Sequence, residues 1–374
     1  MSRIRTTHVG SLPRPDDVVA ALTESEAGPV SDRAAYDRTI SAAVIDIVRR
    51  QAEVGIDIVS DGEMSKISYA TYVRHRLTGF VLGDAPRAVP ADLDEFPAYR
   101  DRIAARGETP VYQRPICRGP IEVSDLSSVD IDIANLKAAS RAAGVSSAFL
   151  TAASPGVIAV FQPNEHYPTQ SEYLYALADA MKTEYEAIAA SGLLLQIDCP
   201  DLAMGRHIKY RDETTEQFLK HAEEQVEVLN HATASIPPDR MRMHLCWGNY
   251  EGPHTHDIDL HLILETVLRA RPAHLSFEAA NHRHAHEWEV WADATVPDHK
   301  VLMPGVLDTS SNYVEHPRLV AQRLRRFADL VGAERVIGSS DCGFGTFAGF
   351  GRVHPDICWR KLGSLVEGAA LASR

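Results

Sequence analysis

The sequence predicts an α/β protein folded as a closed (β/α)8 barrel, and two observations lead to this prediction. Short apolar segments recur along the 374 residues, and each ends in Gly, Pro, Asp, Glu or Cys. Between them lie segments whose apolar residues have helical spacing. Because strand–helix alternation repeated eight times is typical of a barrel, we expect a single barrel domain over residues 1–374. An open doubly wound sheet is the alternative, but no G-x-G-x-x-G sequence follows the first predicted strand.

Eight segments have the composition of strands buried on both faces, because several of them are apolar through their centres. These strands are predicted at residues 5–12, 56–63, 148–154, 193–200, 242–248, 274–280, 301–308 and 335–343. The helices expected between them cover residues 32–53, 171–191, 213–234, 258–270, 316–330 and 355–371.

One stretch departs from the alternation. Residues 81–119 are rich in Pro, Asp and Arg and cover the second crossover. We interpret them as an insertion near the barrel mouth that serves as a lid or as an oligomer contact. A solvated surface insertion is an equally good interpretation.

The composition argues against several classes of protein. The formal net charge is −13 and no dense run of Lys or Arg is present, which argues against nucleic-acid binding. No apolar run is as long as a membrane span, and the N-terminus has no signal-peptide core. The five cysteines are irregularly spaced, so we expect free thiols in a reducing cytoplasm. A homo-oligomer is compatible with the sequence.

Metal-ligand residues occur at the ends of three consecutive predicted strands. His244 and Cys246 are two positions apart, so both side chains can point to one face of their strand. Glu278 ends the next strand, and Cys342 ends the last. Reactive side chains of a barrel lie at the C-terminal strand ends. These four residues are therefore predicted to bind one zinc ion, which thiolate and imidazole ligands favour.

The chemistry of such a site follows from its ligands. Four protein ligands normally form a closed structural site, so catalysis requires one to yield, and the carboxylate of Glu278 is the natural candidate. Two thiolates and a carboxylate make the metal electron-rich, which favours alkyl transfer to a bound thiol over hydrolysis. The plainer interpretation of His244 and Cys246 is a core histidine beside an inert buried cysteine.

The strand ends resemble those of the catalytic half of cobalamin-independent methionine synthase. The segments that carry the resemblance follow in the family's order and are TTHVGSLPR, VSDGE, LQIDCP, HLC, SFE, PGVLD and SDCG. The resemblance implies that His244, Cys246, Glu278 and Cys342 bind a zinc ion that holds the sulfur of homocysteine.

The same resemblance implies how the amino-acid part of homocysteine binds. The backbone of Gly10 and Ser11 would hold its carboxylate, and Glu63 and Asp198 would hold its ammonium group. Two carboxylates at a barrel mouth suit a cationic amine, and a Gly-Ser turn offers N–H groups to an anion.

A structural ion pair is the alternative role for the two carboxylates. Glu63 and Asp198 would then pair with Lys66 or Arg206.

The methyl-donor side differs from the family pattern. The family has a tryptophan that stacks on folate, whereas Phe161 is the nearest aromatic residue here. Ser310, two residues after Asp308, stands where the family has a histidine, and His316 lies nearby in the sequence. Asp308 and Ser310 are therefore the candidate catalytic residues, and we expect a donor other than ordinary methyltetrahydrofolate. No cofactor-binding residues besides the zinc ligands are assigned.

Several functions are open at this point. The first is a zinc-dependent thiol S-alkyltransferase that methylates homocysteine. Epoxyalkane:coenzyme M transferase, a relative in the same superfamily, opens an epoxide with zinc-bound coenzyme M and is the alternative. A barrel similar to porphyrinogen decarboxylase, without metal chemistry, and a non-catalytic zinc-binding barrel are further alternatives.

A histidine-rich segment stands apart from these motifs. Seven histidines lie between residues 254 and 286, and they either bind a second metal or belong to the barrel mouth and surface. They are His254, His256, His261, His274, His282, His284 and His286.

Overall fold

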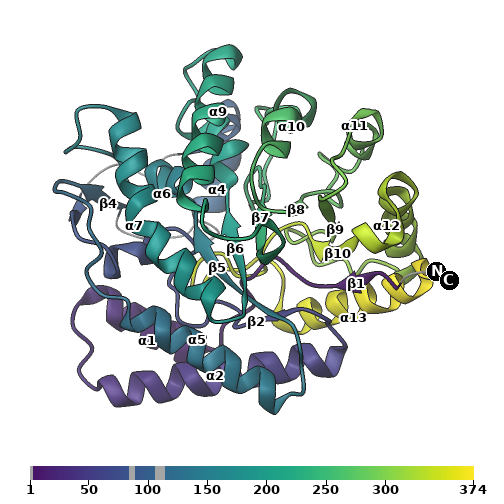
Figure 1. Ribbon diagram of the computed structural model, residues 1–374, viewed down its shortest axis with the longest axis horizontal. Coiled ribbons are helices and arrows are strands. Elements are labelled where there is room, and N and C mark those ends of the chain that lie inside the picture. Colours follow the sequence, from purple (N-terminus) through teal and green to yellow (C-terminus); the bar gives the residue numbers. More distant parts are fainter. Residues whose placement is uncertain (1–2, 84–88, 106–113) are drawn as a thin grey trace.

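Eight parallel strands form a barrel in the computed structural model, which describes residues 3–83, 89–105 and 114–374 (Figure 1). The strands, in their order around the sheet, are β1 (Arg5–Thr6), β10 (Ile337–Ser340), β9 (Val301–Leu307), β8 (His274–Phe277), β7 (Met241–His244), β6 (Leu194–Asp198), β5 (Ala148–Ala153) and β2 (Val59–Ser60). The backbone N–H of Ile58 donates to the carbonyl of Thr6 at 3.1 Å, so the two ends of the sheet meet. The predicted fold class is confirmed.

All eight predicted strands are present, but the first two are short. Residues 5–12 and 56–63 contribute only two strand residues each. Beyond these residues the two segments leave the ladder, and the N–H of Leu12 donates to the carbonyl of Gly62 at 3.2 Å. The strand ends thereby become loops whose side chains reach the barrel mouth.

The register of the parallel strands places the candidate ligands side by side. Asp198 pairs with His244, and His244 pairs with Ser276. Because side chains two residues apart share one face, Cys246 and Glu278 follow next to each other at the same end of the sheet.

The helices surround the strands (Figure 1). Six lie close to their predicted positions, namely α2 (Arg33–Val54), α7 (Gln170–Ala190), α9 (Thr215–Ala232), α10 (Leu260–Leu268), α12 (Pro317–Val331) and α13 (Pro355–Ala372). Local sequence fixes several of their ends. The capping box of Thr214 and Gln217 begins α9, and Gly55, at φ 96°, ends α2.

The structure adds helices that the sequence patterns did not predict. They are α1 (Asp16–Ala27), α5 (Ser127–Ala142) and the shorter α6 (Pro155–Phe161), α8 (Gly205–Ile208) and α11 (Trp288–Asp293). Helix α1 buries only Val18 and Leu22. Two buried positions are too few to reveal a helical period in the sequence.

The described part of the predicted insertion packs next to the loop that follows β7. It contains the antiparallel pair β3 (Phe80–Gly83) and β4 (Arg114–Cys117) and the helices α3 (Ala91–Glu95) and α4 (Pro97–Ala105). Residues 84–88 and 106–113 of the predicted 81–119 insertion lie outside the described residues. Asp92 of α3 accepts hydrogen bonds from the Tyr250 hydroxyl and the His254 N–H, both at 2.7 Å.

A buried arginine lies inside the barrel beneath the candidate ligands. Arg242 of β7 donates to the Thr7 hydroxyl at 3.0 Å and to the His8 carbonyl at 2.8 Å. Its guanidinium carbon lies 3.6 Å from the centre of the Phe149 ring. Burial lowers the pKa of Arg242 to about 9, although the charge of Asp198 raises it. Arg242 therefore places a cation below the acidic end of the barrel.

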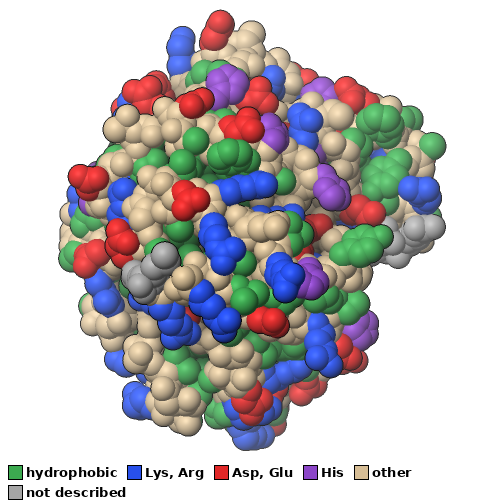
Figure 2. All heavy atoms as spheres, turned by 90° about the vertical axis from the view of Figure 1, so that its right-hand side faces the viewer, with side chains coloured by type: hydrophobic (Ala, Val, Ile, Leu, Met, Phe, Trp, Pro, Cys, Tyr) green, Lys and Arg blue, Asp and Glu red, His purple; other side chains and the backbone are tan. Residues whose placement is uncertain are grey.

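The surface carries charges of both signs. Figure 2 shows acidic, basic and histidine side chains interspersed with hydrophobic ones on the face that includes α12 and α13. Among the described residues, no helix combines the length and the apolar character needed to cross a membrane.

Candidate metal and substrate site

Three predicted ligands converge at the C-terminal end of the barrel. His244 ends β7, Cys246 follows it by two residues, and Cys342 lies two residues beyond β10. The Sγ atoms of Cys246 and Cys342 are 3.1 Å apart, and Nε2 of His244 lies 3.4 Å from Sγ of Cys342. All three residues are buried. The sulfur atoms are too far apart for a disulfide, which needs about 2.05 Å, so these are two free thiols facing an imidazole.

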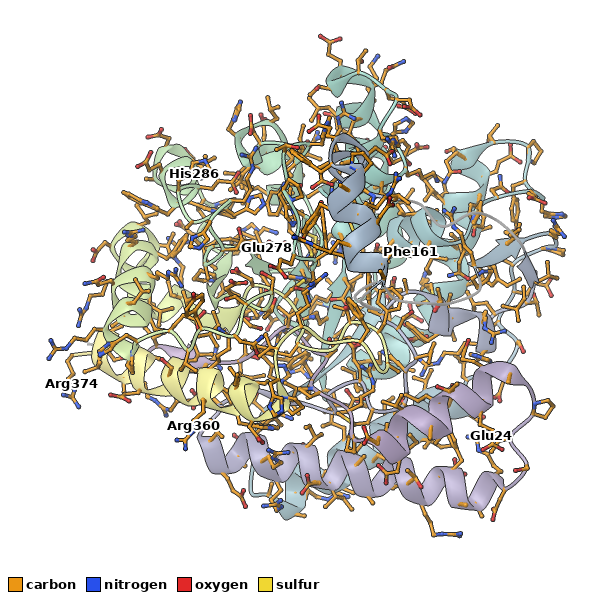
Figure 3. The ribbon with its side chains drawn as sticks, turned by 180° about the vertical axis from the view of Figure 1, so that it is seen from behind. Glu24, Phe161, Glu278, His286, Arg360 and Arg374 are labelled. Atoms are coloured by element: carbon orange, nitrogen blue, oxygen red, sulfur yellow. The ribbon has the colours of Figure 1, made fainter. Side chains whose placement is uncertain are left out.

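Glu278 lies beside this group without belonging to it. The potential ligand atoms of His244, Cys246 and Cys342 all lie within 4.8 Å of one another, and Glu278 is not part of that set. Its Oε1 accepts from the Trp247 N–H at 2.8 Å, and its Oε2 accepts from Nδ2 of Asn281 at 2.6 Å. Figure 3 shows Glu278 near the middle of the molecule.

Burial keeps this group neutral in the structure. The hydrogen bond to Cys342 and burial raise the pKa of Cys246 well above its usual range. The hydrogen bond from Cys246 lowers the pKa of Cys342, but burial and the charge of Glu278 outweigh it. Burial and the charge of Arg242 lower the pKa of His244 to about 3. A divalent cation would reverse this preference for neutral thiols, since it stabilises thiolates and binds neutral imidazole.

Asp341 connects the strand ends that carry Glu278 and Cys342. Its Oδ1 accepts from the N–H groups of Ala279 and Ala280, and its Oδ2 accepts from that of Asn281, all at 2.8 Å. Sequence reasoning gave Asp341 no role, although its position next to Cys342 was a usable signal. It fixes the backbone after β8 against the end of β10.

Glu63 is held in a strained backbone conformation. Its φ is 59°, in the left-handed region that a residue with a side chain rarely adopts. Its Oε1 accepts from the Thr151 hydroxyl at 3.1 Å, and its Oε2 lies 3.7 Å from Nη2 of Arg14. A Cβ atom on Gly10 would lie 2.8 Å from Oε1, so glycine is needed for this close approach. The surrounding contacts direct the carboxylate toward the barrel mouth.

Asp198 ends β6 and faces the same cavity as Glu63. Its Oδ1 accepts from Nε2 of Gln196 at 2.9 Å. Burial, together with the charge of Glu63, raises the pKa of Asp198 to about 8, so the carboxyl group is largely protonated at neutral pH.

The predicted ion-pair partners of these carboxylates bind elsewhere. Nζ of Lys66 donates to the carbonyl and the hydroxyl of Thr151, the latter at 3.1 Å. Nη1 of Arg206 donates to the carbonyl of Tyr210 at 3.0 Å. Arg14, which sequence reasoning did not select, is the cation nearest to Glu63 in the described part of the chain.

Most of the predicted site residues line one pocket. It is lined by apolar residues such as Tyr69 and Phe161 and by the predicted residues Ser11, Glu63, Asp198, His244, Cys246 and Cys342. Gly10 lies behind this wall, and the Ser11 carbonyl accepts from the N–H of Phe344 at 2.8 Å. The thiols and the two carboxylates therefore face a common space.

The two candidate catalytic residues line a neighbouring pocket. Oδ1 of Asp308 accepts from the N–H and the hydroxyl of Ser310, at 2.8 and 2.7 Å. These contacts, with the Ser311 hydroxyl, lower the pKa of Asp308 although burial opposes them. Glu278 and Cys342 also line this second pocket, so Cys342 faces both cavities. His316 is exposed and caps α12 instead.

The histidine-rich segment divides into buried and exposed residues. His256, His261, His282 and His286 are exposed, and Figure 3 shows His286 at the periphery. His274 is partly buried at the start of β8 and lies 3.1 Å from the Met241 carbonyl. His254 and His284 converge on Asp257 within 4.8 Å, next to the segment that follows Cys246.

The chain matches a known protein family over most of its length. Residues 4–92 and 111–350 match the family described as Cobalamin-independent synthase, Catalytic domain. The chain belongs to this family. It is 23% identical to a methionine synthase of Sulfolobus acidocaldarius over 98% of this chain and 91% of the relative. A methionine synthase of Thermococcus kodakarensis is 23% identical over 99% and 93% of the two chains.

Solved structures share the fold of this family member. A B12-independent methionine synthase from Shewanella sp. W3-18-1, in complex with selenomethionine, superimposes with a TM-score of 0.74 at 19% identity and covers 100% and 98% of the chains. A putative vitamin-B12 independent methionine synthase from Listeria monocytogenes gives 0.67 at 20% identity, covering 99% and 98%. The predicted resemblance is confirmed.

The strain at Glu63 predicts an unusual order of stability. Glu63→Gly should be more stable than Glu63→Ala by roughly 0.5–1 kcal/mol, because the left-handed conformation costs alanine about 1–2 kcal/mol, more than the backbone entropy that glycine loses. Urea unfolding of the two variants measures the difference. Asp61, which lacks a positive φ, is the control, and there the alanine variant should be the more stable. Equal stability of the two Glu63 variants would contradict the strain.

Proposed function

We propose that this protein is a zinc-dependent methyltransferase that transfers a methyl group to the sulfur of homocysteine, with residues 1–374 acting as one catalytic domain. The observation that carries the proposal is a pocket shared by two free thiols, an imidazole and two carboxylates. The matched family and the names of the relatives support a methyltransferase of methionine synthesis.

The buried donor set fits one zinc ion. His244, Cys246 and Cys342 would hold it, because two soft thiolates and an imidazole are ligands that zinc prefers. Glu278 would be the fourth ligand, and it would be exchangeable. Its two oxygens accept hydrogen bonds from Trp247 and Asn281, which would stabilise the carboxylate when it leaves the metal. Bound zinc supplies one chemical function, which is to keep the sulfur of the substrate as a nucleophilic thiolate at neutral pH.

The other end of the pocket fits the amino-acid part of homocysteine. Glu63 and Asp198 would bind the ammonium group, and the Gly10–Ser11 backbone would bind the carboxylate. Coenzyme M has a sulfonate and no amine, so it would leave both acids without a cationic partner. The pocket chemistry therefore favours homocysteine over coenzyme M.

The methyl donor is proposed to be a compound other than ordinary methyltetrahydrofolate. The sulfur of homocysteine forms the new bond to the methyl carbon while the donor's bond to that carbon breaks, and the donor keeps the electron pair. Asp308 and Ser310 would act on the donor or its proton from the second pocket, which Cys342 also lines. Phe161 stands on the other side, in the first pocket.

Metal analysis tests the ligand set. Protein purified without chelator should contain about one zinc per chain, and Cys246→Ser and Cys342→Ser should each lose most of it, because a hydroxyl is a much weaker zinc ligand than a thiolate. Cys358→Ser is the matched control, since Cys358 is fully buried in α13, away from the site, and it should retain the metal. Zinc-free wild-type protein would refute the proposed function.

X-ray absorption at the zinc tests the substrate. Homocysteine should add a sulfur ligand and displace an oxygen ligand, because its thiolate replaces Glu278. Coenzyme M at the same concentration serves as the comparison and should leave the spectrum unchanged. A spectrum that changes with neither thiol would identify a non-catalytic zinc site, and a response to coenzyme M alone would point to epoxide opening.

Binding of the amino group should depend on pH through Asp198. L-Methionine carries the ammonium and carboxylate groups but no thiol, so its binding reports on this end of the pocket alone. Asp198, with a pKa of about 8, must lose its proton to hold the ammonium group. The association constant, measured by calorimetry, should therefore rise by up to about tenfold per pH unit between about pH 6 and pH 8. Asp198→Asn should bind more weakly and without this slope, whereas a flat profile in the wild type would contradict the assignment.

A further inference from the structure

A cluster of titratable side chains, most of them buried, lies outside the first pocket, and only His254 of its members lines the second. We call His207, His254, Asp257, His284 and Glu287 the histidine–acid cluster. Nδ1 of His254 and Nε2 of His284 lie 2.9 and 3.0 Å from the same oxygen of Asp257, and Nδ1 of His284 lies 2.9 Å from Oε2 of Glu287. The side chains of Asp257 and His284 are almost fully buried, at 2% and 3% exposure. Nε2 of His207 lies 3.6 Å from the other oxygen of Asp257, so all three histidines surround this carboxylate.

The histidines of the cluster contact the segment of residues 247–250. Nε2 of His207 lies 2.8 Å from the Trp247 carbonyl, and Nε2 of His254 lies 3.1 Å from the Tyr250 carbonyl. The ring of His284 packs on the Trp247 indole with 4.2 Å between the ring centres. Three histidines therefore fix both ends of this four-residue segment.

The segment in turn contacts the candidate metal ligands. The N–H of Trp247 donates to Oε1 of Glu278 at 2.8 Å, and that of Gly248 donates to Sγ of Cys246 at 3.2 Å. Nδ2 of Asn249 donates to the carbonyl of Gly343, next to Cys342, at 2.7 Å. Displacement of the segment would disturb the surroundings of all three ligands.

The backbone of His254 is strained. Among the described residues, Glu63 and His254 are the non-glycine residues with positive φ, which is 54° at His254. Asp92 holds this conformation by accepting from the His254 N–H. Strain of this kind persists where the surrounding contacts over-determine a conformation, and it is frequent near functional sites.

A metal ion would need a free lone pair on a ring nitrogen of each histidine, but in this cluster the ring nitrogens of His254 and His284 face hydrogen-bond acceptors. Burial lowers the pKa of His284, but its hydrogen bonds to Asp257 and Glu287 outweigh burial and raise the pKa to about 10. The carboxylates that face both ring nitrogens favour the protonated form of His284. Both nitrogens of His254 likewise face acceptors. The ring nitrogens of His254 and His284 therefore already have partners, whereas Nδ1 of His207 and Oδ1 of Asp257 lack a hydrogen bond within the described part of the chain.

We propose that the histidine–acid cluster is a positioning network that holds residues 247–250 and thereby sets the geometry of Cys246 and Glu278. This inference rests on the proposed function, because the groups that it positions are the proposed zinc ligands. The cluster residues are positioning residues, since none of them belongs to the set formed by His244, Cys246 and Cys342. His254 lines the second pocket together with Cys342, but its ring nitrogens face Asp257 and Tyr250.

Cobalt(II) tests the network, because its thiolate complexes absorb visible light with bands that depend on ligand geometry. The full-length protein is loaded with cobalt in place of zinc. Asp257→Asn removes the charge on which two histidines converge. It should shift the thiolate-to-cobalt band and weaken cobalt binding by about 10- to 100-fold, as loss of groups that orient metal ligands does.

Asp132→Asn is the matched control. Asp132, on α5, belongs to another buried ionic network, in which Nη2 of Arg76 lies 2.6 Å from its Oδ2. This variant should lose stability while its cobalt spectrum and affinity stay unchanged. If Asp257→Asn fails to fold, His254→Asn, which removes the imidazole bonds to Asp257 and Tyr250, should change the spectrum in the same direction.

The outcomes separate the two proposals. An Asp257→Asn or His254→Asn protein with the wild-type spectrum and affinity would overturn the positioning role while the proposed function stands. Two cobalt ions in the wild type and one in Asp257→Asn would also overturn it, because the cluster would then be a second metal site. Wild-type protein that binds no cobalt would contradict the proposed zinc site itself, and the inference with it.

Discussion

The structure depends on how four buried carboxyl groups are stabilised at one end of the barrel. Different neighbouring groups stabilise each of the four. Backbone N–H groups surround Asp341, and Trp247 and Asn281 donate to Glu278. Arg14 lies near Glu63, while Asp198 keeps its proton. Burying an unpaired carboxylate costs free energy. The way in which each carboxyl group is stabilised therefore limits which ligands it can bind. Glu63 and Asp198 face the first pocket, whereas Glu278 and Asp341 line the second.

The polar interior of the barrel supports this end from below. Arg242 is buried between the strands and makes hydrogen bonds to Thr7 and His8. Burial and the charge of Arg242 both disfavour protonation of His244, so the imidazole is neutral. The same charge lowers the pKa of Asp198, although burial and the charge of Glu63 outweigh it. The charge of Arg242 thus lowers the pKa of both His244 and Asp198, because the neighbouring strands β6 and β7 end beside it.

Loops that the strand pattern does not describe complete the site. Residues 248–250 and Cys342 line both pockets, and Trp247 lies directly before them in the chain. The histidine–acid cluster and Asp92 of α3 hold this segment from the outside. The thiol of Cys342 is therefore reached from two separate pockets. The cluster also explains why the histidines that sequence reasoning regarded as surface residues or a second metal site divide so sharply: His254 and His284 are tied to Asp257, while His282 and His286 are exposed.

By itself, the sequence determined the eight strands, six of the helices and the strand ends that carry His244, Cys246, Glu278 and Cys342, because burial and side-chain alternation are written in local patterns. The family resemblance, now shown, followed from the same strand ends. Only the tertiary structure decided which of these residues meet. It placed Glu278 against Trp247 and Asn281, gave Glu63 its positive φ and Arg14 as a neighbour, and moved Asp308 and Ser310 into a second pocket. These outcomes depend on loop conformations and long-range hydrogen bonds, whose partners are distant in the chain and leave no periodic signal.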